Sequence, residues 1–246
     1  MKYRKWKHMH PEIRCVDHTP VHQQAVYVYQ APQRIWHWVH AISFLVLGVS
    51  GYLIANPLPS VGGEASEHFI MGNIRLIHFI AAYVFAVGFV LRIYWAFVGN
   101  YYAREIFMLP VWRRDWWLGL LYEIRFYLFL EKSIHKELGH TPLAQLAMFI
   151  FNTLGSVFMI VTGFALYSLG LGEGSWADIM FGWVIPLIGD AEATHNWHHL
   201  GMWVMTAFVI VHIYMAVRGD IVSRQSSVST LLSGWRMFKD DLPYEP

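Results

Sequence analysis

Four long apolar runs constrain this chain more than any other feature of its sequence. They cover residues 35–54, 74–98, 143–169 and 197–217. Each run reaches the ~20 residues that a helix needs to cross the hydrocarbon core of a bilayer. Inside lipid only a helix or a closed barrel satisfies its own backbone hydrogen bonds, and uninterrupted runs of this length indicate helices. The sequence therefore predicts an all-α integral membrane protein, a bundle of four transmembrane helices.

The composition agrees with a membrane protein. Of the 246 residues, 56% are hydrophobic and only 14% are charged, whereas soluble domains usually carry about 25% charged residues. A net charge of +1 gives no electrostatic basis for binding nucleic acid. The single cysteine, Cys15, cannot form an internal disulfide, and the sequence has no cysteine cluster for zinc or iron–sulfur. Since the first apolar run begins only near Ile35, we expect no cleaved signal peptide.

The distribution of Lys and Arg predicts the orientation. Six of them precede the first run, six lie in the middle loop and four lie in the tail 218–246, but the loops 56–73 and 170–196 contain none. Because basic residues accumulate on the cytoplasmic side, both termini and the middle loop are expected there. We expect one domain, residues 1–246, in the bacterial inner membrane, with a cytoplasmic N-terminal tail at 1–26.

A fifth apolar segment, 112–130, is interrupted by charges. These are Arg113, Arg114, Asp115, Glu123 and Arg125, and they are mixed with tryptophan and tyrosine. Mixed charged and aromatic character is typical of a helix that lies along the lipid headgroups. We therefore expect an interfacial amphipathic helix in the middle cytoplasmic loop. An ordinary amphipathic helix on a soluble face is the alternative.

Histidines inside apolar runs are costly in lipid and are usually functional. One lies in the first run (His37), one in the second (His78) and two in the fourth (His198 and His212). The two in the fourth run are fourteen residues apart, about 1,400° of helical rotation, so they share a face within ~40°. They are separated by about 21 Å along the axis, which predicts one near each surface of the membrane.

Matching the histidines by depth gives two pairs. His37 and His212 lie near the cytoplasmic side, and His78 and His198 lie near the outer side. Two opposed imidazoles suit the axial positions of a haem, whereas a zinc site wants four ligands at one depth. A lone histidine on an apolar helix is more often a core residue than a ligand, but four at matched depths favour two haem sites.

Glycines and arginines accompany these histidines. Gly48 and Gly51 lie within ~40° of the face of His37, level with the outer pair, where small residues let a bulky ring approach. Helix–helix packing is the alternative explanation for both. Arg34 and Arg75 each precede a histidine by three residues and are candidates to bind a haem propionate, although Arg34 also suits a side chain that extends to the interface. If the helical register were shifted by one residue, His199 would take the place of His198 as the predicted ligand.

These motifs together resemble the b-type cytochrome subunit of membrane-bound nickel–iron hydrogenases. The segments that carry the resemblance are Ala31-Pro-Gln-Arg-Ile-Trp-His-Trp, Gly51-Tyr-Leu-Ile, Pro57-Leu-Pro-Ser-Val-Gly-Gly-Glu, Met71-Gly-Asn-Ile-Arg-Leu-Ile-His-Phe, Arg92-Ile-Tyr-Trp-Ala-Phe-Val-Gly-Asn and Asn196-Trp-His-His-Leu-Gly-Met-Trp. The resemblance covers about residues 27–220 and leaves the N-terminal tail outside.

The resemblance implies four transmembrane helices and two haems b, with ligands at His37, His78, His198 and His212. It also implies hydrogenase small and large subunits as partners on the outer face, and membrane quinone as the electron acceptor. The chain would then be the electron-transfer subunit of a hydrogen:quinone oxidoreductase, not the subunit that splits hydrogen. The cytochrome subunit of a formate dehydrogenase-like complex shares this plan and is one alternative. A membrane anchor or channel with a histidine proton relay is another.

Overall fold

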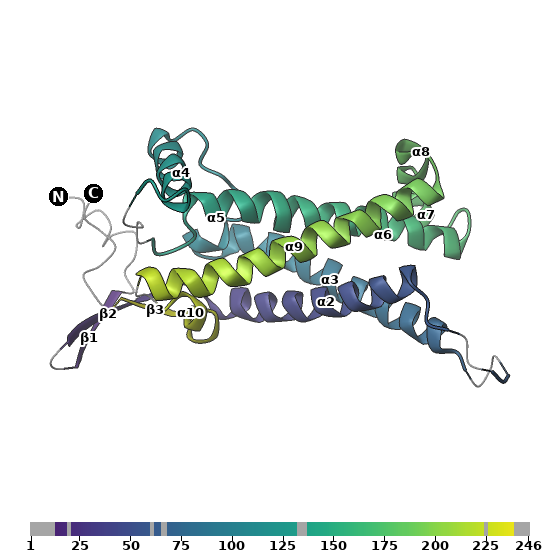
Figure 1. Cartoon of the computed structure of the whole chain (residues 1–246), viewed down its shortest axis with the longest axis horizontal. Helices are drawn as coiled ribbons and strands as arrows, with labels where there is room; N and C mark the ends of the chain where they lie inside the picture. Colours follow the sequence, from purple (N-terminus) through teal and green to yellow (C-terminus); the bar gives the residue numbers. More distant parts are fainter. Residues whose placement is uncertain are drawn as a thin grey trace. The chain divides into compact units, whose positions relative to one another are not determined.

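The computed structural model of this chain describes residues 13–18, 21–59, 62–64, 68–131, 137–223 and 226–238. Within this part of the chain, four helical spans are long and apolar enough to cross a membrane (Figure 1). They are Ala31–Ala55 (α2), Ile70–Val98 (α3), Pro142–Leu171 (α5 to α6) and Ala191–Val222 within α9. These spans confirm the predicted four-helix membrane fold.

The spans extend beyond the apolar runs because polar residues continue or cap the helices. Helix α2 has Pro32 in its first turn, where the missing N–H needs no partner. Helix α9, Ala191–Ser223, begins six residues before its apolar run. The Asp190 carboxylate accepts a hydrogen bond from the Ala193 N–H at 2.7 Å, which satisfies a donor at the helix start.

The third span is composite. It begins with α5, Pro142–Ala147, continues through a π-helical segment, Met148–Leu154, and ends with α6, Gly155–Leu171. The Thr141 hydroxyl caps α5 by accepting a hydrogen bond from the Ala144 N–H at 3.4 Å. Hydropathy measures only how apolar the run is, so it does not reveal the π-helical segment.

Short helices occupy the loops and the C-terminal part of the chain. The middle loop contains α4, Arg114–Tyr127, which buries Trp116, Glu123 and other residues at helical spacing. A helix was predicted in this region, and its place along the lipid headgroups stays a prediction. The other short elements are η1 (Tyr101–Ala103), α7 (Trp176–Phe181), α8 (Val184–Ile188) and α10 (Ser227–Ser233).

A small antiparallel sheet joins the two tails and was not expected from the sequence. Its strands are β1 (Ile13–His18), β2 (Val21–Tyr27) and β3 (Trp235–Phe238), in the order β1-β2-β3. Tyr27 pairs with Trp235, and their ring centroids are 5.2 Å apart. Residues 1–12 and 239–246 of the predicted tails lie outside the described residues.

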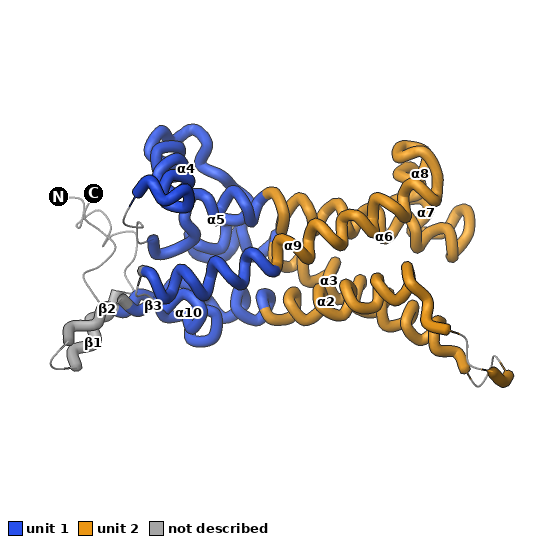
Figure 2. The backbone as a smooth tube through the Cα atoms, viewed as in Figure 1, with its two compact units in different colours: residues 1–37, 93–149, 210–246 blue, residues 38–92, 150–209 orange. Residues whose placement is uncertain are grey.

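The chain divides into two compact units (Figure 2). Unit 1 comprises residues 1–37, 93–149 and 210–246, and unit 2 comprises residues 38–92 and 150–209. The division separates the two predicted histidine pairs, because one pair falls entirely in unit 1 and the other in unit 2. The expectation of a single domain stays a prediction.

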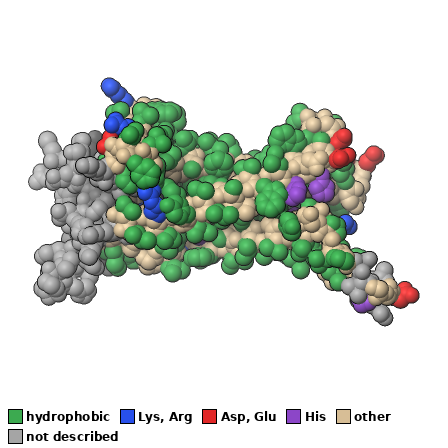
Figure 3. Space-filling view, in the orientation of Figure 1, with side chains coloured by type: hydrophobic (Ala, Val, Ile, Leu, Met, Phe, Trp, Pro, Cys, Tyr) green, Lys and Arg blue, Asp and Glu red, His purple; other side chains and the backbone are tan. Residues whose placement is uncertain are grey.

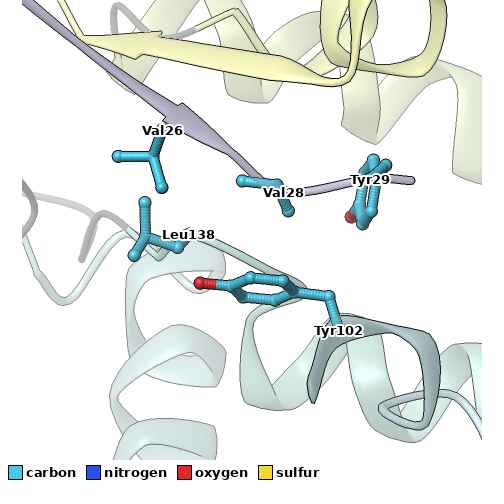
Figure 4. Packing of buried hydrophobic residues seen from close by; sticks show 5 residues of the cluster. All are labelled: Val26, Val28, Tyr29, Tyr102 and Leu138. Carbon is cyan, nitrogen blue, oxygen red and sulfur yellow. The ribbon is translucent and has the colours of Figure 1, made fainter. Parts of the chain in front are cut away.

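Unit 1 has a small hydrophobic core next to the sheet (Figure 4). The side chains of Val26, Val28, Tyr29, Tyr102 and Leu138 point toward one another there. By contrast, large apolar side chains of the spanning helices remain exposed, for example Val90 at 64% and Ile210 at 65%. Hydrophobic side chains cover most of the visible helical surface (Figure 3). A surface of this kind suits contact with lipid.

Candidate functional site

Unit 2 encloses a cavity of about 420 Å³ that is bordered by α2, α3, α6 and α9. Five of the predicted cofactor-binding residues line it: Gly48, Gly51, Arg75, His78 and His198. The rest of the lining is mainly apolar. Both the volume and the lining are typical of a site that holds an organic ligand or cofactor.

The first imidazole of the cavity belongs to His78 on α3. Its Nδ1 lies 2.9 Å from the Ser50 hydroxyl oxygen on α2. That hydroxyl donates its own hydrogen to the Val46 carbonyl at 2.6 Å, so its oxygen accepts a hydrogen bond from the Nδ1–H of His78. A neutral imidazole that donates through Nδ1 keeps the lone pair of Nε2 available for a metal.

The second imidazole, His198 on α9, is held in the same way. Its Nδ1 lies 2.8 Å from the Thr162 hydroxyl oxygen on α6. The Thr162 hydroxyl donates to the Phe158 carbonyl at 2.7 Å, so it too accepts from the imidazole. Thr162 is 2% exposed, which shields this hydrogen bond from water. Both histidines therefore present Nε2 as the available nitrogen.

A glycine follows each of these hydroxyl residues and packs against the same imidazole. A Cβ added at Gly51 would lie 3.4 Å from His78 Cε1, and one added at Gly163 would lie 3.1 Å from His198 Cε1. The missing side chain at Gly51 therefore leaves room both for an imidazole and for the neighbouring helix. At Gly48 an added Cβ would meet nothing within 4 Å, so this residue borders open space in the cavity.

Hydropathy and spacing alone did not indicate Ser50, Thr162 or Gly163 as site residues. A signal for them was present, because a hydroxyl residue is followed directly by glycine at 50–51 and again at 162–163. Each such pair supplies one hydrogen bond to an imidazole and the space beside that imidazole. The pattern indicates a site only if each hydroxyl–glycine pair faces a histidine, and the sequence alone does not show this.

The second predicted histidine pair lies in unit 1. The imidazoles of His37 and His212 are close enough to interact electrostatically, and His140 interacts with both. Arg34, one turn before His37, donates a hydrogen bond to the Leu232 carbonyl. Its predicted contact with a haem propionate therefore stays a prediction.

The remaining histidines of the spans are His40, His195 and His199. His40 stacks on Phe85 with ring centroids 4.2 Å apart. His195 and His199 line the cavity of unit 2 beside His198. The hydrogen bond to a hydroxyl is made by His198 and not by its neighbour His199, whose Nε2 is buried without a partner in the described part of the chain.

The donor set fits a planar macrocycle better than a bare metal ion. Among the described residues, no group of three or more His, Cys, Asp or Glu side chains is placed to hold an ion. Two imidazoles that line one apolar cavity and keep Nε2 available match the axial ligands of a haem. Arg75 at the cavity wall is placed to bind a carboxylate of such a group.

Comparison with known proteins gives one family and several close relatives. The family described as "Prokaryotic cytochrome b561" matches residues 28–234. A "Probable Ni/Fe-hydrogenase B-type cytochrome subunit" of Azotobacter chroococcum mcd 1 is 62% identical over 221 residues, which cover 90% of this chain and 92% of the relative. The protein of the same name from Cupriavidus necator strain H16 is 53% identical, covering 88% and 89%.

A third relative is the "Probable Ni/Fe-hydrogenase 1 B-type cytochrome subunit" of Escherichia coli K12. It is 52% identical over 217 residues, which cover 87% of this chain and 91% of the relative. The family match and the three relatives together confirm the resemblance that the sequence motifs indicated.

Proposed function

Because this chain belongs to the prokaryotic cytochrome b561 family, we propose that it is a dihaem cytochrome b subunit that anchors a nickel–iron hydrogenase to the bacterial cytoplasmic membrane. In this role it transfers electrons from the iron–sulfur clusters of the hydrogenase to membrane quinone. The names of its relatives support the hydrogenase as partner. The four apolar spans support the anchoring role.

One observation carries the proposal: two imidazoles in an apolar cavity of unit 2 both keep Nε2 available because hydroxyls accept from their Nδ1–H. When bound there, a haem b supplies one-electron redox chemistry. His78 and His198 would hold its iron, and Arg75 would bind a propionate. The apolar lining excludes water, which helps to fix the redox potential of the site.

The pair in unit 1 would hold the second haem. His37 and His212 are its ligands in this proposal, with Arg34 near one propionate. Their electrostatic interaction supports the pairing. From the charge distribution along the sequence, we place this pair near the cytoplasm, on the side of quinone reduction, and the pair in unit 2 near the hydrogenase.

The orientation follows the same charges. The loops 56–73 and 170–196 contain acidic residues but no Lys or Arg, so they would face outward toward the hydrogenase small and large subunits. Both termini and the middle loop would then face the cytoplasm. The names of the relatives favour a hydrogenase over a formate dehydrogenase-like partner.

Anaerobic spectroscopy of the purified complex tests this function. Hydrogen gas should reduce haem b in the complex of this chain with its hydrogenase, and added quinone should reoxidise it. Hydrogenase separated from this chain is the control, and it should keep hydrogen oxidation with a soluble dye but lose quinone reduction. If the chain showed no reducible haem b spectrum, the proposal would be wrong and a histidine proton relay would be the better account.

A further inference from the structure

Unit 1 contains a cluster of carboxylates that the haem sites do not use. Its members are Glu105, Glu123 and Glu137, and we call them the carboxylate cluster. Glu105 and Glu123 are 6% and 2% exposed, whereas Glu137 is partly exposed. Burying carboxylates is costly unless they are protonated or bonded, so each member requires a structural or functional reason.

Glu123 has a structural reason. Its carboxylate accepts a hydrogen bond from the Leu143 N–H at 2.8 Å, in the first turn of α5. An acceptor at this position satisfies a donor that the helix leaves open. The role of Glu123 is therefore to connect α4 to the start of the third span.

Glu105 is hydrogen-bonded to His140, which interacts electrostatically with the histidine pair of unit 1. Its Oε2 accepts hydrogen bonds from both the backbone N–H and the Nδ1 of His140, each at 3.0 Å. A Cβ at Gly139 would collide with the Glu105 carboxylate, so the glycine permits this close approach. His140 in turn interacts electrostatically with His37 and His212.

Glu137 is the partly exposed member of the cluster. Burial, with the charges of Glu123 and Glu105, raises its pKa to about 7, while the charges of Arg236 and Arg113 act in the opposite direction. A carboxyl group with a pKa near neutral pH both takes up and releases a proton under physiological conditions. The charges of Glu137 and Glu105 interact, Glu105 is hydrogen-bonded to His140, and His140 interacts electrostatically with His37 and His212.

Reduction of quinone requires protons, which the haems do not supply. One quinone takes two electrons and two protons to become a quinol; the electrons come from hydrogen through the partner, and the protons must come from the aqueous side. We propose that Glu137 and Glu105, together with His140 hydrogen-bonded to Glu105, form a proton-uptake site. This site would supply the protons for quinone reduction at the inner haem, so the inference rests on the proposed function.

Conservative carboxyl variants in the complete hydrogenase–cytochrome complex test the proposal. Glu105→Gln and Glu137→Gln keep the shape of each side chain and remove its acidity. Hydrogen:quinone turnover should fall about 10²-fold, the lower range for loss of a positioned proton donor. The rate of haem reduction by hydrogen without quinone should stay unchanged. Glu131→Gln is the matched control, because Glu131 pairs with Arg125 at 2.9 Å and is not among the charges that act on Glu137.

The pH profile separates proton supply from a structural role. Below about pH 7 Glu137 carries the proton that it donates, and above this pH the protonated fraction falls. Wild-type quinone turnover should therefore decline on the alkaline side, and Glu137→Gln should lack this dependence at its lower rate. The proposal would be wrong if both variants reduced quinone at the wild-type rate and with the wild-type pH profile.

An infrared measurement separates failure of the proton-uptake site from failure of the proposed function. Infrared difference spectra of reduced minus oxidised wild-type complex should contain a protonated-carboxyl carbonyl band that is missing in Glu137→Gln. If Glu105→Gln lost its haems, the infrared spectrum and the kinetics of Glu137→Gln would test the proposal instead. Absence of the carboxyl band from the wild-type spectrum would refute the proton-uptake site. If hydrogen reduced the wild-type haems but quinone failed to reoxidise them, the proposed function itself would fail.

Discussion

Two hydroxyl groups decide which nitrogen each imidazole of the unit 2 cavity offers. Ser50 and Thr162 donate to carbonyls of their own helices, so their oxygens accept from the imidazoles. Hydrogen bonds of this type orient metal ligands and raise their basicity. The geometry of the site thus depends on residues that bind no cofactor themselves.

Removing these hydroxyls should weaken the outer haem without removing its ligands. Ser50→Ala and Thr162→Val should each lower haem affinity about 10- to 100-fold and raise the midpoint potential, because a less basic imidazole stabilises ferric iron less. Spectroelectrochemical titration and haem retention measure both effects. Thr206→Val is the control, since the Thr206 hydroxyl bonds only the Met202 carbonyl in the described hydrogen bonds. Equal potentials in all variants would contradict the hydroxyl role.

The two histidines of α9 should have different functions. His198→Ala should lose the outer haem, so hydrogen should no longer reduce the inner haem at a useful rate. His212→Ala should lose the inner haem, so hydrogen should still reduce the outer haem while quinone reduction collapses. Stopped-flow spectra with hydrogen as donor distinguish the variants. Near-normal quinone turnover in His212→Ala would show that quinone takes electrons at the outer haem.

At the scale of single residues, sequence patterns singled out the histidines that line the cavity, but not the hydroxyls that are hydrogen-bonded to them. A histidine in an apolar run is costly, so it is conspicuous in the sequence. Ser and Thr are common in such runs, because their hydroxyls bond a carbonyl of the preceding turn. Whether a hydroxyl also faces an imidazole depends on the rotation of two helices about their axes, which hydropathy does not determine.

At the scale of helices and strands, hydropathy predicted the four spans but placed their ends within the apolar runs. The ends are set by caps such as Asp190 and Thr141, which are polar. The sheet escaped prediction because β3 has four residues and pairs with a strand more than 200 positions earlier. Pairing of this kind is decided by tertiary contacts and not by a local period.

The close contact between α6 and α9 gives a prediction at this scale. Gly163→Val should push the His198 imidazole out of position, because an added Cβ would lie only 3.1 Å from its Cε1. Outer haem occupancy should fall by half or more, roughly as for a tenfold loss of affinity, while helical content stays the same. Gly170→Val, on the same helix with open space around the added Cβ, should keep wild-type occupancy. Haem content and circular dichroism measure the two quantities, and equal occupancy in both variants would count against the packing role.

At the scale of the whole molecule, the asymmetric placement of Lys and Arg predicts one orientation in the membrane. A cysteine at position 64 should react with a membrane-impermeant thiol reagent in intact cells of a Cys15→Ser background. A cysteine at position 113 should react only after permeabilisation. The opposite labelling pattern would reverse the orientation, and with it the assignment of the outer and inner histidine pairs.

The number of haems that the chain binds decides whether both histidine pairs are cofactor sites. Four histidines in two pairs, one in each compact unit, predict two haems b per chain, both six-coordinate and low-spin. Pyridine haemochrome absorbance divided by protein mass from amino-acid analysis measures this ratio in the intact complex. We expect a ratio of two, which falls to one in His198→Ala. A reproducible ratio of one in undegraded wild-type complex, with no haem released during extraction, would contradict it.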